Sequence, residues 1–145
     1  MAAKKEKKES KLLMNILHRA QEKHGYFSEA LLKKLSAKHN IPIARLYGVV
    51  KFYTMFHTSP QGKYIIEMCG SPSCVLNDGK SIEKFLEAEL GIHIGQTTKD
   101  KMFSLYKTSC IGCCDEAPAV LINCEPHTKL TVERLRTLLA KLRSE

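Results

Sequence analysis

Apolar residues recur every three or four positions along the N-terminal part of the chain, over residues 10–24, 28–40 and 42–56. This spacing is typical of amphipathic helices, so it predicts three of them. Ser10 and Ser28 stand where helix N-caps are expected. Because helices of this kind cannot bury their apolar stripes singly, we expect a three-helix bundle. The stripes contain Leu12, Leu13, Ile16, Leu17 and Ala20, then Leu31, Leu32 and Leu35, then Ile43, Leu46, Val49, Val50, Tyr53 and Phe56.

An aromatic group, formed by Phe52, Tyr53 and Phe56, lies at the end of the third predicted helix. Helical spacing of aromatic residues usually marks buried packing. We therefore expect this group to pack in the core or between the two parts of the chain. Its functional alternative is an interface to a larger partner subunit.

The second part of the chain alternates between strand-like and helix-like patterns. A turn at residues 59–62, which contains proline and glycine, separates the two parts. The order of elements predicts an α+β fold in which a mixed β-sheet is flanked by helices. We expect a disordered Lys-rich leader at residues 1–10, a helical bundle at 11–60 and a sheet domain at 61–145. The predicted elements are strands at 63–68, 92–94, 102–107 and 119–123, a helix at 80–90, and a last helix that Thr131 caps.

The chain of 145 residues has a formal net charge of +8, part of which comes from the Lys-rich leader. Nucleic-acid binding would use this charge, but no recognition motif accompanies it. Docking to an acidic protein partner is the alternative use. No apolar run approaches the ~20 residues of a membrane span, and residues 1–10 resemble neither a signal peptide nor an Arg-rich transit peptide. We expect a cytoplasmic, prokaryotic protein without direct membrane insertion, peripheral at most to a membrane complex.

Five of the six cysteines fall in two short segments, each of which follows a predicted strand. The first segment contains Cys69 and Cys74 in C-x4-C spacing. The second contains Cys110, Cys113 and Cys114, which offer either C-x2-C or C-x3-C spacing. Strands that end in Gly- and Pro-bearing loops can direct several thiolates at one point. This pattern therefore predicts a metal centre.

Several kinds of site fit these cysteines. The four-residue loop between the first two thiols favours an iron–sulfur cluster over a single zinc ion, and neither loop contains the histidines of a Rieske centre. A thioredoxin-like dithiol oxidoreductase that uses Cys110 and Cys113 stays open, as does a zinc-stabilised nucleic-acid-binding protein. A purely structural role as buried apolar residues is disfavoured by the clustering. The chain has no GxGxxG motif or P-loop, so nothing in it is expected to bind NAD or FMN.

The two cysteine segments also resemble a known family. C-x4-C followed later by C-[IL]-G-x-C-x-x-A-P is similar to the thioredoxin-like [2Fe–2S] ferredoxins, and the similarity extends through the stretch YGVVKFYTMF of the third helix. The resemblance implies a thioredoxin-like sheet domain and a [2Fe–2S] cluster. Cys113 stands where the family usually has a small residue, and Pro72 is a second departure. By position, the implied cluster ligands are Cys69, Cys74, Cys110 and Cys114, whereas Cys113 and Cys124 are expected to be free thiols.

Family members are subunits of NADH:quinone oxidoreductase (complex I), of NAD-linked and bifurcating hydrogenases, and of NAD-dependent formate dehydrogenases. The resemblance implies an electron-transfer subunit without catalytic residues of its own. FMN and NAD(P) would be bound by a partner flavoprotein subunit, with further iron–sulfur subunits in the same complex. Asp115 and Glu116 are expected to cap the second cysteine loop or to influence the cluster through their charge, and Lys107 to favour its reduced form.

Overall fold

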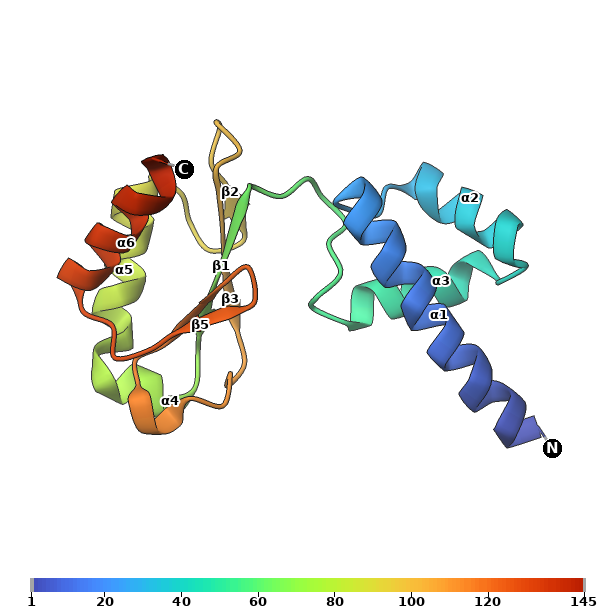
Figure 1. Ribbon diagram of the computed structural model, residues 1–145, viewed down its shortest axis with the longest axis horizontal. Helices are drawn as coiled ribbons and strands as arrows, with labels where there is room; N and C mark the ends of the chain where they lie inside the picture. Colours follow the sequence, from blue (N-terminus) through green and yellow to red (C-terminus); the bar gives the residue numbers. More distant parts are fainter. Residues whose placement is uncertain (1, 145) are drawn as a thin grey trace. The chain divides into compact units, whose positions relative to one another are not determined.

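The computed structural model describes the backbone of residues 2–144 and the side chains of residues 13–144. The chain divides into two compact units, Met1–Pro60 and Gln61–Glu145. The first unit is helical, and the second contains a β-sheet with helices packed on it (Figure 1). Each unit has a hydrophobic core of its own.

The first unit consists of α1 (Ala2–His24), α2 (Glu29–His39) and α3 (Ile43–Phe52). Ser28 caps α2 as expected, since the N–H of Leu31 donates to Ser28 Oγ at 3.2 Å. The helix ends at Asn40, whose φ of 52° is left-handed. The buried residues of this core are Leu13, Leu17, Ala20, Phe27, Leu32, Leu35, Leu46, Val50 and Phe56.

Two boundaries in this unit differ from the predictions. The helix α1 begins at Ala2 instead of at Ser10. The prediction of a disordered leader at residues 1–10 concerns a segment whose side chains lie outside the described residues, and it stays a prediction. The helix α3 ends at Phe52, so the helical spacing does not continue to Phe56. Phe56 is buried in the core, as one part of the prediction for this aromatic group requires, whereas Phe52 is 77% exposed and does not pack in the core.

The second unit contains a five-stranded sheet in the order β2-β3-β1-β4-β5. Its central pair, β1 (Tyr64–Cys69) and β3 (Phe103–Thr108), runs parallel, and the other pairs are antiparallel. The edge strand β2 covers Gln96–Thr97, and the hairpin strands β4 and β5 cover Val120–Ile122 and Glu125–His127. This is the expected mixed sheet, and the α+β prediction is confirmed.

The helices of this unit are α4 (Pro72–Cys74), α5 (Lys80–Leu90) and α6 (Val132–Ser144). A kinked helical segment, Val75–Gly79, joins α4 to α5, and a 3-10 turn covers Cys114–Glu116. Helices α5 and α6 lie side by side along one face of the sheet (Figure 1). The core between them and the sheet is formed by Tyr64, Ile66, Met68, Ile82, Leu86, Phe103, Leu105, Val120, Ile122, Leu130, Leu135 and Leu139.

Two strand predictions need correction. The edge strand is Gln96–Thr97 and not residues 92–94, because the N–H of Gln96 donates to the carbonyl of His93 and closes a turn there. The strand β5 was not predicted, since Glu125–His127 has no apolar alternation. It forms because Asn123 and Cys124 both have positive φ, 49° and 70°, as a tight two-residue hairpin turn requires.

Candidate metal centre

The two cysteine loops lie at the same edge of the sheet. Strands β1 and β3 are parallel, with Cys69 in register with Thr108, so the loops that follow them leave the sheet together. The N–H of Gly70 in the first loop donates to the carbonyl of Thr108 at 2.9 Å. Ser73 Oγ then reaches across to the carbonyl of Cys114 at 3.0 Å. Segments far apart in the sequence thus form one site.

The four predicted ligands are arranged as two pairs of thiols. Cys110 Sγ lies 3.1 Å from Cys114 Sγ. Cys69 and Cys74 are within hydrogen-bonding reach of each other. Both residues of the first pair are buried, whereas both of the second pair are exposed. The site therefore has one side within the protein and one side open to the surface.

Ser71 contributes a hydroxyl to the centre of this arrangement. Its Oγ lies 3.3 Å from Cys69 Sγ and accepts from the N–H of Cys74 at 3.5 Å. Ser71 is the N-cap of the short helix α4, and Pro72 occupies its first position. The sequence prediction missed this residue, although serine before proline at a loop-to-helix junction is a recognisable capping signal.

The thiols differ in acidity because their surroundings differ. Burial raises the pKa of Cys69, but hydrogen bonds from the hydroxyl and N–H of Ser71 and from the N–H of Ile111 outweigh it and bring that pKa down to about 7. Burial, followed by the contact with Cys69, raises the pKa of Cys74. The contact with Cys110 raises the pKa of Cys114. A bound metal ion would displace the remaining thiol protons, because only thiolates act as its ligands.

The second cysteine loop is fastened to the turn before α6 by a set of contacts that we call the Glu116 latch. The carboxylate of Glu116 accepts from Thr128 Oγ1 at 2.6 Å and from Lys129 Nζ at 2.8 Å. The backbone adds a bond from the N–H of Lys129 to the carbonyl of Glu116 at 2.8 Å. The side chain of Lys129, then that of Thr128, lowers the pKa of Glu116. This fits the expected loop-capping role of Glu116.

The other two cysteines lie outside the thiol pairs. Cys113 is half-buried, and none of the hydrogen bonds among the described residues joins its sulfur to another thiol. Cys124 is exposed in the hairpin turn before β5. The thiol that lies within hydrogen-bonding distance of Cys110 is that of Cys114, whereas a C-x2-C dithiol oxidoreductase would use Cys113.

The donor set fits a two-iron cluster. Among the described residues, no three His, Cys, Asp or Glu side chains converge closely enough to hold a single metal ion. Two pairs of thiols at one sheet edge match a [2Fe–2S] unit, in which each iron takes two thiolates. The hydrogen bonds from Ser71 and Ile111 to Cys69 add the outer contacts that such sulfurs usually receive.

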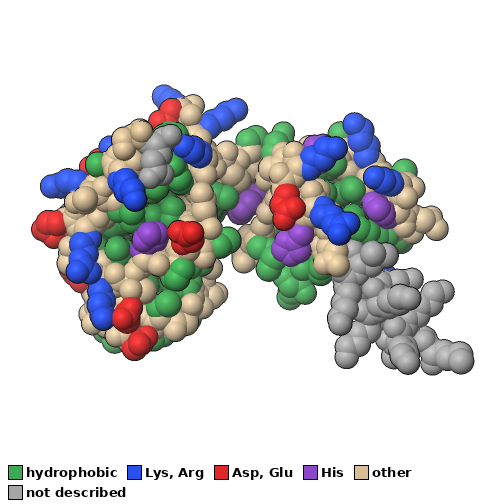
Figure 2. Space-filling view, in the orientation of Figure 1, with side chains coloured by type: hydrophobic (Ala, Val, Ile, Leu, Met, Phe, Trp, Pro, Cys, Tyr) green, Lys and Arg blue, Asp and Glu red, His purple; other side chains and the backbone are tan. Residues whose placement is uncertain are grey.

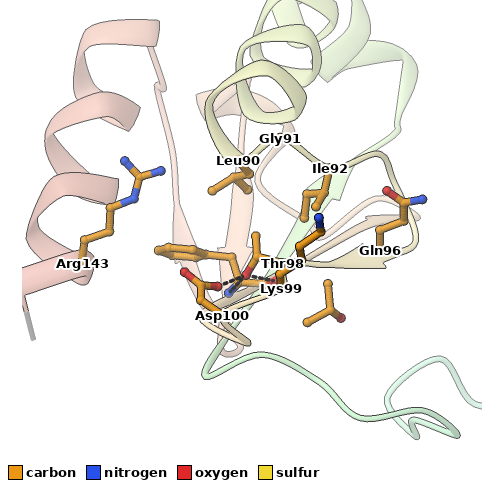
Figure 3. Close-up of a pocket in the computed structure, with 10 residues that line it drawn as sticks. Leu90, Gly91, Ile92, Gln96, Thr98, Lys99, Asp100 and Arg143 are labelled. Atoms are coloured by element: carbon orange, nitrogen blue, oxygen red, sulfur yellow. Dashed lines mark hydrogen bonds between the residues drawn. The ribbon is translucent and has the colours of Figure 1, made fainter.

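A cavity of about 830 Å³ lies at the other end of the sheet (Figure 3). It is lined by Phe103, with which β3 begins, and by Arg143 and Asp100, and none of its lining residues is a cysteine. This cavity is therefore separate from the thiol site.

The positive charge is not shared evenly along the chain. Lys and Arg outnumber Asp and Glu three to one in residues 1–60 and equal them in residues 61–145, so the whole net charge of +8 belongs to the first unit. Figure 2 shows Lys and Arg side chains among hydrophobic ones over the unit of α1–α3. Exposed large hydrophobic residues also gather there: Ile43, Tyr47, Phe52, Tyr53 and Met55. None of the described helices combines the length and hydrophobicity that a bilayer crossing requires.

Comparison with known proteins finds relatives that are similar over most of this chain. A subunit of the NADH-quinone oxidoreductase of Rhizobium meliloti (strain 1021) is 33% identical over 132 residues, which are 91% of this chain and 79% of the relative. The NADP-reducing hydrogenase subunit HndA of Solidesulfovibrio fructosivorans is 32% identical over 129 residues, which are 89% of this chain and 75% of HndA.

A solved structure has the same fold. A chain of the NAD+-reducing [NiFe]-hydrogenase in its air-oxidised state superposes with a TM-score of 0.77 and 26% identity over 88% of this chain. The present chain spans only 22% of that hydrogenase chain. The sequence profile of the thioredoxin-like [2Fe-2S] ferredoxins matches residues 1–143. This protein therefore belongs to the thioredoxin-like [2Fe-2S] ferredoxin family.

Proposed function

We propose that this chain is the [2Fe–2S] electron-transfer subunit of a multisubunit NAD(P)H-linked oxidoreductase, and that Cys69, Cys74, Cys110 and Cys114 hold the cluster. The observation that carries the proposal is the parallel pairing of β1 with β3, which brings the two thiol pairs to one sheet edge. Family membership supports the identity of the cluster.

The residues of this chain would bind and orient the cluster. When bound, the cluster supplies one-electron redox chemistry. Cys69 and Cys74 would hold its buried side, and Cys110 and Cys114 its exposed side. Ser71 and the N–H of Ile111 would donate to the sulfur of Cys69, and the N–H of Ala119 to that of Cys74. Such hydrogen bonds stabilise negative charge on sulfur, so they favour the reduced state.

The electron partner in this proposal is a flavoprotein subunit that binds FMN and NAD(P). Relatives of this chain are named as subunits of an NADH-quinone oxidoreductase and of an NADP-reducing hydrogenase, which supports a place in such an assembly. Further iron–sulfur subunits would belong to the same complex. The exposed pair, Cys110 and Cys114, marks the side where an electron can enter or leave at short range. We place the complex in the cytoplasm, either free or at the periphery of a membrane complex.

Metal analysis tests the proposal directly. Chain purified without oxygen should contain iron and acid-labile sulfide in equal amounts, be red-brown, and give a one-electron paramagnetic signal after reduction. A colourless chain with stoichiometric zinc would contradict the proposal.

Single substitutions test the ligand set. C114A should lose the cluster or change its spectrum, because Cys114 forms the exposed pair with Cys110. C113A should keep the cluster, as should the matched control C124A, whose thiol is exposed in the β4–β5 turn. Retention of the cluster in C114A together with its loss in C113A would move the fourth ligand to Cys113.

A further inference from the structure

Lys107 lies against the backbone of the first cysteine loop. It pairs in register with Met68 near the end of β3, one position before the pair formed by Thr108 and Cys69. Its alkyl chain crosses Gly70: a Cβ placed on that glycine would lie 3.1 Å from Lys107 Cε and 3.3 Å from Cγ. The missing side chain at Gly70 thus makes room for a lysine beside a predicted cluster ligand.

Glu83 fixes the position of this lysine. It lies in the first turn of α5, and its Oε2 accepts from Lys107 Nζ at 2.9 Å. The side chains of Lys107 and Glu83 are 42% and 25% exposed, so the pair is partly withdrawn from solvent. Charges in such a place are screened less than fully exposed ones. The alkyl chain of Lys107 runs past Gly70 of the cysteine loop, whereas Glu83 reaches the ammonium group from α5.

From this geometry we infer that Lys107, positioned by Glu83, sets the reduction potential of the cluster. The inference rests on the proposed function, since it needs the cluster. Reduction adds one electron to a group that already carries negative charge, and no bond in the chain is broken. A cation beside the first loop stabilises the added charge and raises the potential. In the second cysteine loop, the carboxylate of Glu116 is already paired with Lys129 from the turn before α6.

Three variants of the full chain with its cluster in place give a fixed order of potentials. K107M leaves Glu83 without its cation, so its potential should be the lowest. E83Q leaves Lys107 without its anion, so its potential should be the highest. The double variant K107M/E83Q should lie between the two single variants, because it loses the cation and the anion together. The measurement is a dithionite titration followed by the paramagnetic signal and the visible absorbance.

The structure offers a matched control pair whose carboxylate lies on the same helix, α5. Arg143 Nη1 bonds to Glu89 Oε1 at 2.9 Å, with exposures of 45% and 30% that resemble those of Lys107 and Glu83. This pair lies at the end of α5 and of the sheet that is away from the cysteines, beside the cavity of Figure 3. R143Q and E89Q should leave the potential unchanged. K107R keeps the positive charge, so it should stay close to wild type.

The outcomes separate this inference from the proposed function. A wild-type chain that holds no iron or sulfide counts against the proposed function. A loaded chain in which K107M, E83Q and the double variant all keep the wild-type potential would overturn the inference. Equal shifts in K107M and R143Q would also overturn it, since they would show a general effect of charge. If K107M does not load, the comparison of the double variant with E83Q carries the same test. High salt should reduce the differences in reduction potential between wild type and the variants, because it screens the charges.

Discussion

At the scale of single residues, Ser71 shows how one short side chain serves both fold and site. Its hydroxyl caps α4 and lies beside the thiol of Cys69, whose pKa is brought down to about 7. A cap accepts from an N–H of the first helical turn, and in the three-residue helix α4 that N–H belongs to Cys74. The serine that the helix needs as its N-cap therefore also supplies a hydroxyl group beside the thiols.

Gly79 is a second residue on which the first loop depends. A Cβ added there would lie 2.5 Å from the carbonyl oxygen of Cys74, which is backbone and cannot turn away. G79A should therefore displace Cys74, destabilise the chain by about 1–3 kcal/mol and lower its iron content. Chemical unfolding and iron analysis measure these effects. The control is G48A on the exposed side of α3, where nothing lies within 4 Å of the added Cβ. That variant should be more stable than wild type by up to about 1 kcal/mol, and an equally stable G79A would refute the steric argument.

At the scale of elements, strong periodicity decided what the sequence could predict. The stripes of α2, α5 and α6 and the apolar runs of β1, β3 and β4 give elements close to the predicted ranges. The strand β5 and the kinked segment Val75–Gly79 have no such pattern, because a turn at Asn123 and a positive φ at Asp78 create them. For the site, spacing and family resemblance predicted the four thiols, and the fold brings them together as two pairs. Partners such as Thr128 and Lys129 could not be predicted, since they come from a turn that only tertiary packing places there.

The Glu116 latch gives a prediction for the second cysteine loop. E116Q removes the negative charge of the carboxylate to which Lys129 and Thr128 donate. The second cysteine loop is then held less firmly, so the variant should release the cluster to a chelator about tenfold faster than wild type. D115N changes the same charge one residue earlier and should have a smaller effect. Equal rates for the two variants would show that only the loop's net charge matters.

At acid pH, wild type should no longer have a higher free energy of unfolding than E116Q. Because Lys129 and Thr128 lower the pKa of Glu116 below 4.5, the latch contributes fully above pH 4.5 and is lost as the pH falls through the lowered value. The difference in unfolding free energy between wild type and E116Q should therefore shrink to nothing in that range. A difference that persists after Glu116 is protonated would contradict the latch.

At the scale of the whole molecule, charge and redox chemistry belong to different units. The net charge of +8 lies in residues 1–60, whereas the thiols lie in the neutral second unit. Exposed apolar residues along α3 accompany the positive charge. This division suggests that the helical unit guides association and that the sheet unit handles electrons.

The prediction at this scale concerns association with the flavoprotein subunit that the proposed function requires. If the positive unit guides association, the rate should fall steeply with rising ionic strength, measured by stopped-flow mixing. Charge reversal at Lys34 and Lys38 in the first unit should slow association. The same reversal at Lys80 and Lys84 in the second unit is the control. An association rate that does not change with salt would show that the positive charge of the first unit does not guide association.

The parallel pairing of β1 and β3 also has a consequence for biogenesis. Parallel strands need a long crossover, here through α5, before they can meet. During synthesis on the ribosome, Cys69 and Cys74 emerge well before Cys110 and Cys114, and they cannot find those partners until β3 has docked. Insertion of the proposed cluster would thus have to wait until β3 has docked, and a nascent chain that stalls inside α5 would carry only half of the binding site.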